Sequence, residues 1–357
     1  MRVVSLEVGN LRIIADISIE PSPALNLISG PNGSGKSSLL EALHILGSGR
    51  SFRSHRLRDV VRRESDSLRV VGRTLGDDGL VDVTGIEYSR DGLRIRRGGN
   101  TLKAASDLAR TLPIVAVTPD SYRLVTDGAD IRRRIIDRLL FHMEPSSLGV
   151  HQRYRKALRQ RNAAIRGDPA SQGLSGWSKE LAIAGSELTE IRMRHAERIL
   201  PLMVDNVSRF VGRRMKIRFY PGWDSAISLE DAYERTLAAD RMRGYTALGP
   251  HRADLKFSID GHSVRQTLSR GETKLFVMAI AVTQVHDIAE SVGSPPMVLV
   301  DDLASELDIA GRNRCLGELR ETGAQLFLTE IPGSDPLAVG QDSSARVFHV
   351  KHGQVGG

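Results

Sequence analysis

The sequence has one cysteine, few aromatic residues and no long hydrophobic run. A single cysteine, Cys315, excludes an internal disulfide and a cysteine-based zinc cluster, and nothing around it resembles a catalytic dyad. The longest apolar run, residues 275–282, is far shorter than the ~20 residues that span a bilayer, so we expect no transmembrane helix and no membrane partner. With aromatic residues at 4%, stacking on single-stranded nucleic acid is not expected to be the main binding mode.

The first twenty residues also lack the pattern of a signal peptide. They carry Glu7, Asp16 and Glu20, and they contain no long apolar core followed by a small-residue cleavage site. We therefore expect a cytoplasmic protein. At roughly 150 residues per domain, a chain of 357 residues is expected to form about two domains.

Positive charge exceeds negative charge in this chain. Lys and Arg total 50 against 43 acidic residues, for a net charge of +7, and 42 of the basic residues are arginine. Such a balance suits a polyanionic partner, although an arginine-rich composition can also reflect a GC-rich genome. Two arginine-rich segments, residues 50–63 and 153–166, are candidates for DNA phosphate contacts; the alternative for each is a solvated charged face.

The hydrophobic pattern predicts an α/β protein with an inserted helical region. Strands are expected first, with a break at Gly9 and Asn10, and helical spacing of apolar residues begins at Asp130 and continues to Phe210, where Pro201 should kink a helix or mark a junction. The predicted strands cover residues 3–8, 11–19, 24–29, 68–74, 81–88, 93–96, 111–117, 215–220, 254–259, 297–300, 325–329 and 346–350. We therefore predict a head built from residues 1–118 and 213–357, and a helical arm formed by residues 119–212.

The strongest local signal is a complete P-loop of the form G-x-x-x-x-G-K-[ST] at residues 30–37. An apolar strand is predicted to end at Ser29, and Lys36 opens a predicted helix whose N-terminus favours an anion. Lys36 is expected to hold the β- and γ-phosphates of a nucleotide, and Ser37 to ligate Mg²⁺. The predicted nucleotide-binding residues here are Gly30, Pro31, Asn32, Gly33, Ser34, Gly35, Lys36, Ser37 and Ser38.

A second element places two acidic residues after an apolar strand. Residues 297–300 are apolar and are followed by Asp301 and Asp302. Alone, this pattern is typical of a buried strand with surface acids. Together with a P-loop, it predicts that Asp301 contributes to the Mg²⁺ site and that Asp302 is the general base for the attacking water.

A third element resembles the ATP-binding-cassette ATPases. Ser269 and Gly271 precede an apolar helix, 32 residues before Asp301, and Asp308 follows the paired acids. In that family, a Ser-Gly-Gly-Gln-like signature at a helix N-terminus meets the γ-phosphate bound by a second subunit. The resemblance therefore implies that Ser269 and Gly271 bind ATP across a dimer, and that Asp308 lies in a loop that crosses toward the partner's nucleotide.

Further motifs resemble the RecF family, in the SMC-like branch of these ATPases. They are the P-loop, residues 49–53, the Gly-Pro-His-Arg-Ala-Asp run at 249–254, residues 268–274 and the run from Asp301 to Asp308, and they cover nearly the whole chain in the family's order. The resemblance implies an ABC-type ATPase head with mixed β-sheets and an inserted helical arm. It also implies a slow, DNA-stimulated ATPase that forms an ATP-dependent homodimer, binds double-stranded and gapped DNA, and acts with RecO and RecR to load RecA.

The chain departs from the family pattern at four places. Glu272 stands where a glutamine is common, and an acidic side chain facing a γ-phosphate would be unfavourable. Asp302 replaces the glutamate of many relatives, which predicts slow turnover. Thr329 takes the place of the transporters' switch histidine, and no clear glutamine follows the first helix.

Two other functions remain open at this point. The ATPase subunit of an ABC transporter would share the cassette motifs. A small-molecule kinase would share the P-loop but leaves the Ser269 signature unexplained.

Overall fold

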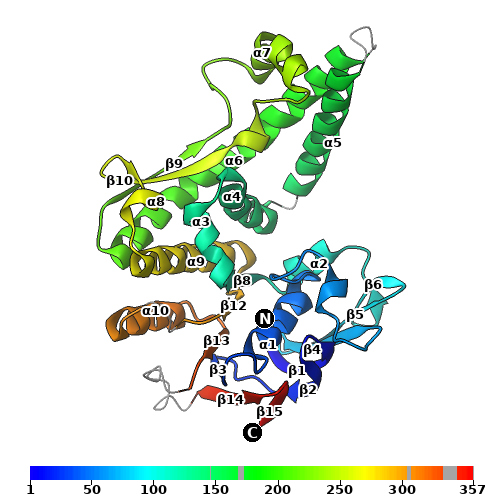
Figure 1. The fold of residues 1–357 in the computed structure, drawn as a ribbon, viewed down its shortest axis with the longest axis vertical. Coiled ribbons are helices and arrows are strands. Elements are labelled where there is room, and N and C mark those ends of the chain that lie inside the picture. Colours follow the sequence, from blue (N-terminus) through cyan, green and yellow to red (C-terminus); the bar gives the residue numbers. More distant parts are fainter. Residues whose placement is uncertain (145, 168–172, 304–306, 333–343, 357) are drawn as a thin grey trace. The chain divides into compact units, whose positions relative to one another are not determined.

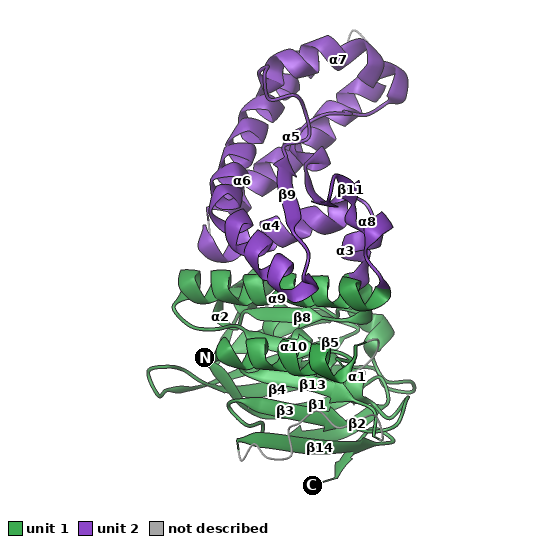
Figure 2. Ribbon diagram, turned by 90° about the vertical axis from the view of Figure 1, so that its left-hand side faces the viewer, with its two compact units in different colours: residues 1–121, 270–357 green, residues 122–269 purple. Residues whose placement is uncertain are grey.

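The computed structural model describes residues 1–144, 146–167, 173–303, 307–332 and 344–356. These residues form two compact units, shown in different colours in Figure 2. Unit 1 comprises Met1–Ser121 and Arg270–Gly357, and unit 2 comprises Tyr122–Ser269.

Unit 1 contains two six-stranded sheets (Figure 1). The first is antiparallel, in the order β2-β1-β4-β5-β6-β7, with bounds β1 Arg2–Leu11, β2 Ile14–Ile19, β4 Leu68–Leu75, β5 Val81–Ser89, β6 Gly92–Arg97 and β7 Asn100–Thr101. The second has the order β15-β14-β3-β13-β12-β8, with bounds β3 Leu25–Ser29, β8 Ile114–Val117, β12 Met297–Val300, β13 Leu326–Glu330, β14 Ala345–Lys351 and β15 Gln354–Gly356. It is parallel except where β15 pairs with β14, so the predicted α/β head with mixed sheets is confirmed.

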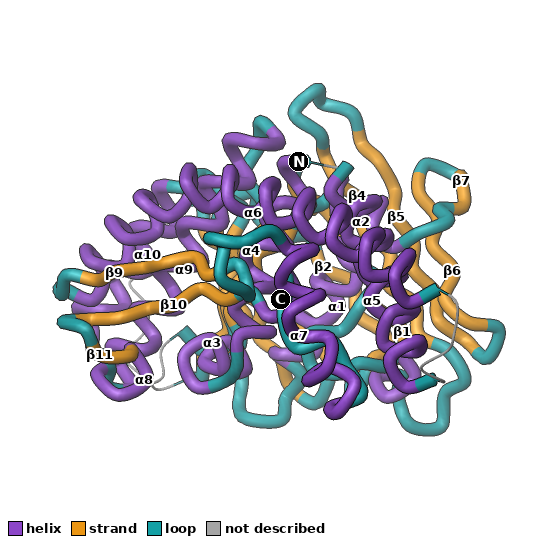
Figure 3. The backbone as a smooth tube through the Cα atoms, turned by 90° about the horizontal axis from the view of Figure 1, so that it is seen from above, coloured by secondary structure: helices purple, strands orange, loops and turns teal. Residues whose placement is uncertain are grey.

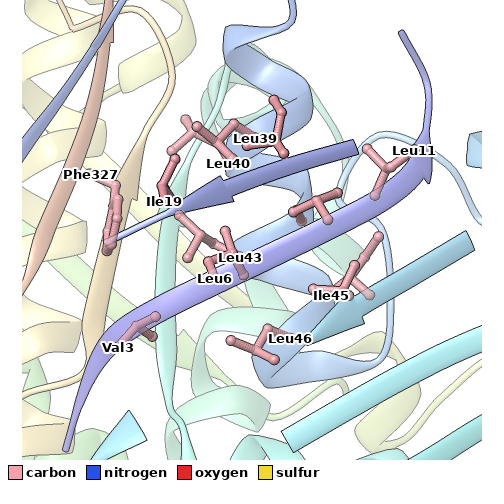
Figure 4. Packing of buried hydrophobic residues seen from close by; sticks show 14 of the residues in the cluster. Val3, Leu6, Leu11, Ile19, Leu39, Leu40, Leu43, Ile45, Leu46 and Phe327 are labelled. Atoms are coloured by element: carbon pink, nitrogen blue, oxygen red, sulfur yellow. The ribbon is translucent and has the colours of Figure 1, made fainter. Parts of the chain in front are cut away.

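Helix α1 (Lys36–Ser48) contacts strands of both sheets. Its apolar side chains, including Leu39, Leu43 and Leu46, are fully buried together with Leu6 of β1 and Phe327 of β13 (Figure 4). A helix between two sheets must be apolar on opposite faces, and ten of the thirteen residues of α1 are buried. This packing fixes the position of the loop that precedes the helix.

The other helices of unit 1 are α2 (Ala105–Thr111), α9 (Arg270–Val292) and α10 (Ile309–Glu321). By length and composition, α9 could cross a membrane, but 67% of its apolar window is buried and it contacts α10 and β8. These features are typical of the core helix of a soluble protein.

Cys315 of α10 is buried, and burial raises the pKa of its thiol to about 12, so this cysteine is not a reactive nucleophile.

Unit 2 is mainly helical but also contains a three-stranded antiparallel sheet in the order β11-β10-β9. Its elements are α3 Arg123–Thr126, α4 Ala129–Met143, α5 Ser147–Arg166, α6 Leu174–Val211, β9 Met215–Tyr220, α7 Leu229–Arg243, β10 Asp254–Ile259, β11 His262–Ser263 and α8 Val264–Thr267. Helix α6 continues through Pro201 as a single element, so the predicted junction is absent.

The boundary predicted at residue 213 differs from the observed division of the chain. Residues 213–269, expected in the head, belong to unit 2. The reason is packing, since β9 contacts α6 and β10 contacts α4, which gives this small sheet a core in common with the helices.

The predicted turn at Gly9 and Asn10 is wrong. Gly9 belongs to the ladder of β1 and β2, and the turn consists of Arg12 and Ile13, between the paired residues Leu11 and Ile14.

The Gly-Pro-His-Arg run near residue 250 forms contacts within unit 2. The His251 Nε2 donates a hydrogen bond to the Thr246 carbonyl (3.0 Å), and its Nδ1 accepts one from the Tyr154 hydroxyl (2.6 Å). The Pro250 carbonyl accepts a hydrogen bond from Arg192 at 2.7 Å. Gly249 has φ of 119°, and an added Cβ would lie 2.6 Å from the Tyr233 hydroxyl, so this position requires glycine. The run therefore has a structural role in joining the helices of unit 2.

Candidate functional site

The P-loop joins a fully buried strand, β3, to the first turn of α1. Gly33 and Gly35 have φ of 75° and 116°, a backbone conformation that glycine adopts without strain. An added Cβ on Gly30 would lie 2.3 Å from the Val350 carbonyl oxygen of β14. The motif's glycines are therefore required by backbone conformation and by the close approach of a neighbouring strand.

Lys36 is held at the centre of this loop. Its Nζ donates hydrogen bonds to the carbonyl oxygens of Gly30 (2.6 Å) and Pro31 (2.9 Å), and the residue is 9% exposed. Burial lowers the pKa of the Lys36 ammonium below its usual value, while Asp301 and Asp302 oppose that shift. The amine is thus a positioned cation in the loop.

A cleft of about 390 Å³ opens beside the loop. The Ser34 hydroxyl is buried and has no hydrogen-bond partner within the described part of the chain. A buried hydroxyl of this kind is expected to have a partner, and a phosphate oxygen would supply one. The cleft is lined by Arg12, Ile13, Asn32, Gly33, Ser34, Gly35, Lys36, Ser37, Ser38, Arg53, Pro119, Asp301, Asp302, Thr329, Glu330 and Ile331.

Asp301 meets the P-loop directly, although 264 residues separate it from Ser37. The Ser37 hydroxyl donates to the Asp301 Oδ1 at 3.0 Å, and the Thr329 hydroxyl donates to the same oxygen at 2.8 Å. Strand β12 ends at Val300 beside β13, which carries Thr329, so parallel strand ends bring these groups together. A serine hydroxyl and a carboxylate are hard oxygen ligands of the kind that Mg²⁺ binds, so the donor set fits this metal.

The backbone of Asp302 is held on both sides. Its N–H donates to the Thr329 hydroxyl at 2.7 Å, and its carbonyl accepts from the Lys274 Nζ at 2.5 Å. Asp302 has φ of 60°, a left-handed conformation that costs a non-glycine residue about 1–2 kcal/mol. These hydrogen bonds offset the strain and keep the Asp302 side chain at the cleft.

Thr329 therefore positions both acidic residues, and its loss has a predictable effect. We expect Thr329→Val to lower the rate of ATP hydrolysis about tenfold and to raise the Mg²⁺ concentration needed, because it removes the hydrogen bonds to the Asp302 N–H and to Asp301, each worth about 0.5–1.5 kcal/mol. Thr329→Ser keeps the hydroxyl and should restore the rate. The measurement is the rate of ATP hydrolysis across a series of Mg²⁺ concentrations. Equal rates for Thr329→Val and Thr329→Ser would show that the packing of residue 329, and not its hydroxyl, sets the rate.

Sequence reasoning missed Arg12, which lines the cleft, and the buried Glu41 that holds it. Arg12 donates two hydrogen bonds to Glu41, which is fully buried in α1, and the Ser51 hydroxyl donates to the same carboxylate. Ser51 belongs to the motif at 49–53, whose Arg53 is exposed and lines the cleft. The available signal was Glu41 itself, a charged residue inside an otherwise apolar helical pattern, which requires a buried partner.

The remaining predicted site residues lie elsewhere. Ser269 is exposed at the end of unit 2, directly before α9, and Glu272 lies in the first turn of that helix. The Asp308 side chain caps α10 by accepting from the Gly311 N–H at 2.7 Å. Within the described part of unit 1, neither Gly271 nor Asp308 lines the cleft. Residues 304–306 of the acidic motif lie outside the described residues.

Comparison with protein families and curated proteins gives consistent matches over the whole chain. The family model described as "RecF/RecN/SMC N terminal domain" matches residues 2–354. A "DNA replication and repair protein RecF" from Pseudomonas paraeruginosa is 37% identical, over 99% of this chain and 97% of the relative. A protein of the same name from Vibrio campbellii is 35% identical, over 99% of this chain and all of the relative.

Solved structures give a matching fold. A structure described as the recombination mediator protein RecF with ATP, in the RecFOR pathway, superposes with a TM-score of 0.87 at 24% identity and covers 99% of this chain and 97% of that one. An Smc head bound to the C-terminal winged-helix domain of ScpA superposes with a TM-score of 0.60 at 16% identity, covering 99% of this chain and 96% of that one. Both share the observed arrangement of sheets and helices.

Proposed function

This chain belongs to the RecF family of SMC-like proteins, and on that premise we propose that it is an ATP-dependent DNA-binding protein of recombinational repair and replication maintenance. The observation that supports this most directly is the contact between Ser37 of the P-loop and Asp301 of β12, at the cleft that also holds Lys36. Lys36 and the P-loop form the proposed anion site, and Ser37 and Asp301 beside it are the proposed Mg²⁺ ligands. ATP is accordingly the proposed nucleotide, and Mg²⁺ the proposed metal.

Each cleft residue has a proposed role in hydrolysis. Lys36 and the backbone N–H groups of the loop bind the β- and γ-phosphates, and Ser34 donates its hydroxyl to a phosphate oxygen. Ser37 and Asp301 hold Mg²⁺, which when bound neutralises charge that develops on the phosphates. Asp302 orients or deprotonates the attacking water, with Thr329 and Lys274 holding its backbone. The short acidic side chain of Asp302 suits slow turnover.

The second half of the ATP site is proposed to come from another copy of the chain. Ser269 and Gly271 at the start of α9 would bind the partner's γ-phosphate, and Asp308 would approach the same nucleotide. Among the residues of unit 1 that the structure describes, Gly271 and Asp308 are not part of the cleft lining, which agrees with a role across a homodimer. Such a dimer would close only with ATP, bind duplex and gapped DNA in the cytoplasm at the nucleoid, and act with RecR and RecO in loading RecA.

The transporter alternative is not favoured. The curated relatives are replication and repair proteins, matched over nearly their whole length. The apolar helix α9 is largely buried. The kinase alternative does not account for the full-length match either.

The deciding experiment is fluorescence anisotropy on labelled duplex DNA that carries a single-strand gap, with and without ATP and Mg²⁺. We expect tight binding only with ATP, and a steep loss of affinity with salt, because the contacts are made to phosphates. Size-exclusion chromatography with light scattering should show a dimer under the same conditions. Binding that is indifferent to ATP would contradict the proposal, provided that RecR has also been tested in the mixture.

A further inference from the structure

The small sheet of unit 2 presents a basic surface that the sequence did not reveal. Strands β9, β10 and β11 lie side by side in Figure 3 and pair in antiparallel register. Along β9, Met215 and Ile217 are buried, whereas Lys216 and Arg218 are exposed on the opposite face. In β10, Lys256 pairs directly with Arg218 and is exposed on this same face. We call Lys216, Arg218 and Lys256 the basic face.

One carboxylate lies on this face, that of Asp254, two residues before Lys256 in β10. Asp254 is already engaged by Arg132, which donates to it from Nε at 2.7 Å and from Nη2 at 3.0 Å. Within the described residues, none of the three basic side chains has a salt-bridge partner, and the ammonium of Lys256 lies over the Tyr220 ring at 4.6 Å. The surface therefore carries three uncompensated positive charges.

This arrangement is unfavourable for the sheet itself. Arg218 and Lys256 are directly opposite across the strands, where like charges are destabilising. Lys216 lies two residues from Arg218, about 7 Å along the strand. Three cations so close together are stabilised when a polyanion with closely spaced charges binds over them.

A pocket of about 530 Å³ lies on this face, and its chemistry suits phosphate groups. Ser258, Gly261 and Ser263 are small lining residues, two of them with hydroxyls that can donate to phosphate oxygens. The apolar lining residues Val125, Leu255, Phe257 and Val264 are each at most 6% exposed. The pocket consequently offers the cations of the basic face and two hydroxyls, and its one carboxylate, Asp254, is paired with Arg132.

We propose that the basic face and its pocket form a binding site for the phosphate backbone of DNA. The inference rests on the proposed function and deepens it, since it assigns DNA contacts to the sheet of unit 2 in addition to the arginine-rich segments. Binding there is independent of base sequence, because cations and hydroxyls contact phosphates and not base edges.

The test compares two variants with equal loss of charge. In the site variant, Lys216→Gln, Arg218→Gln and Lys256→Gln are combined. In the control, Arg235→Gln, Arg241→Gln and Arg243→Gln are combined on α7, where these side chains are also exposed in unit 2. Both lower the net charge from +7 to +4. Binding of each variant to gapped duplex DNA is measured with ATP and Mg²⁺ between about 50 and 200 mM salt. The melting temperature and the binding of fluorescent ATP confirm that each variant is folded.

We expect the site variant to lose affinity about tenfold or more, and the slope of log K against log salt to fall by about 3, while the control stays close to the unmodified protein. Equal losses in both variants, or no loss in the site variant, would overturn the assignment. A site variant that loses only its binding to a polyglutamate peptide would also overturn it, in favour of an acidic protein partner. Absence of ATP-dependent DNA binding in the unmodified protein is a different result, because it rejects the proposed function itself.

Discussion

Replacing Lys36 with methionine should abolish ATP-dependent DNA binding. Lys36 is the buried cation of the P-loop, and its Nζ already lies among backbone carbonyls beside the cleft. Charge-assisted hydrogen bonds contribute roughly 1.5–3 kcal/mol each, so we expect ATP affinity to fall about a hundredfold or more. Fluorescent ATP binding, light scattering and DNA anisotropy should all report the loss.

Asp302→Asn is the matched control for Lys36→Met. It removes the proposed base but leaves the phosphate-binding groups in place, so ATP binding and dimerisation should persist while hydrolysis stops. DNA complexes formed with ATP should then last longer than those of the unmodified protein. A Lys36→Met protein that still dimerised with ATP and bound DNA normally would refute the assignment of the cleft.

Asp240→Ala should strongly destabilise unit 2. Asp240 and Arg161 are both fully buried and form a 2.9 Å ion pair. The same guanidinium donates to the Thr246 hydroxyl and lies over the Tyr233 ring at 4.7 Å. Removing one partner leaves an uncompensated buried charge, which costs about 3–5 kcal/mol in the free energy of unfolding. Urea denaturation measures this loss.

Two further variants separate the buried charge from general packing effects. Combining Asp240→Leu with Arg161→Met removes both charges, so much of the lost stability should return. Arg153→Met removes two exposed ion pairs, to Glu180 and to Glu187, and should cost less than about 1 kcal/mol. If Asp240→Ala cost no more than Arg153→Met, the buried pair would not be a stabilising element.

Much of the fold was predictable because local pattern and tertiary environment agree. The apolar run ending at Val300 and the alternation in residues 215–220 and 254–259 predicted β12, β9 and β10 with their observed bounds. A buried parallel strand must be apolar throughout, and a half-buried strand must alternate, so these patterns leave little choice of structure.

Other predictions failed because the deciding interactions are between residues distant in sequence. Arg161 belongs to an arginine-rich segment that is a candidate either for DNA contact or for a solvated charged face, yet it is fully buried against Asp240, 79 residues away. Glycine favours a turn at Gly9 and Asn10, but pairing with β2 carries the strand on to Leu11, opposite Ile14. Composition does not show which charges are buried.

The sequence by itself determined the P-loop, the apolar strand before Asp301 and the RecF resemblance, because these depend on residue types at short, regular spacing. Only the tertiary structure decided that Ser37, Asp301 and Thr329 meet, that Lys274 holds the backbone of Asp302, and that Lys216, Arg218 and Lys256 share one face. The physical reason is that strand order and register, which follow from burial of the whole core, place groups together that no local pattern connects.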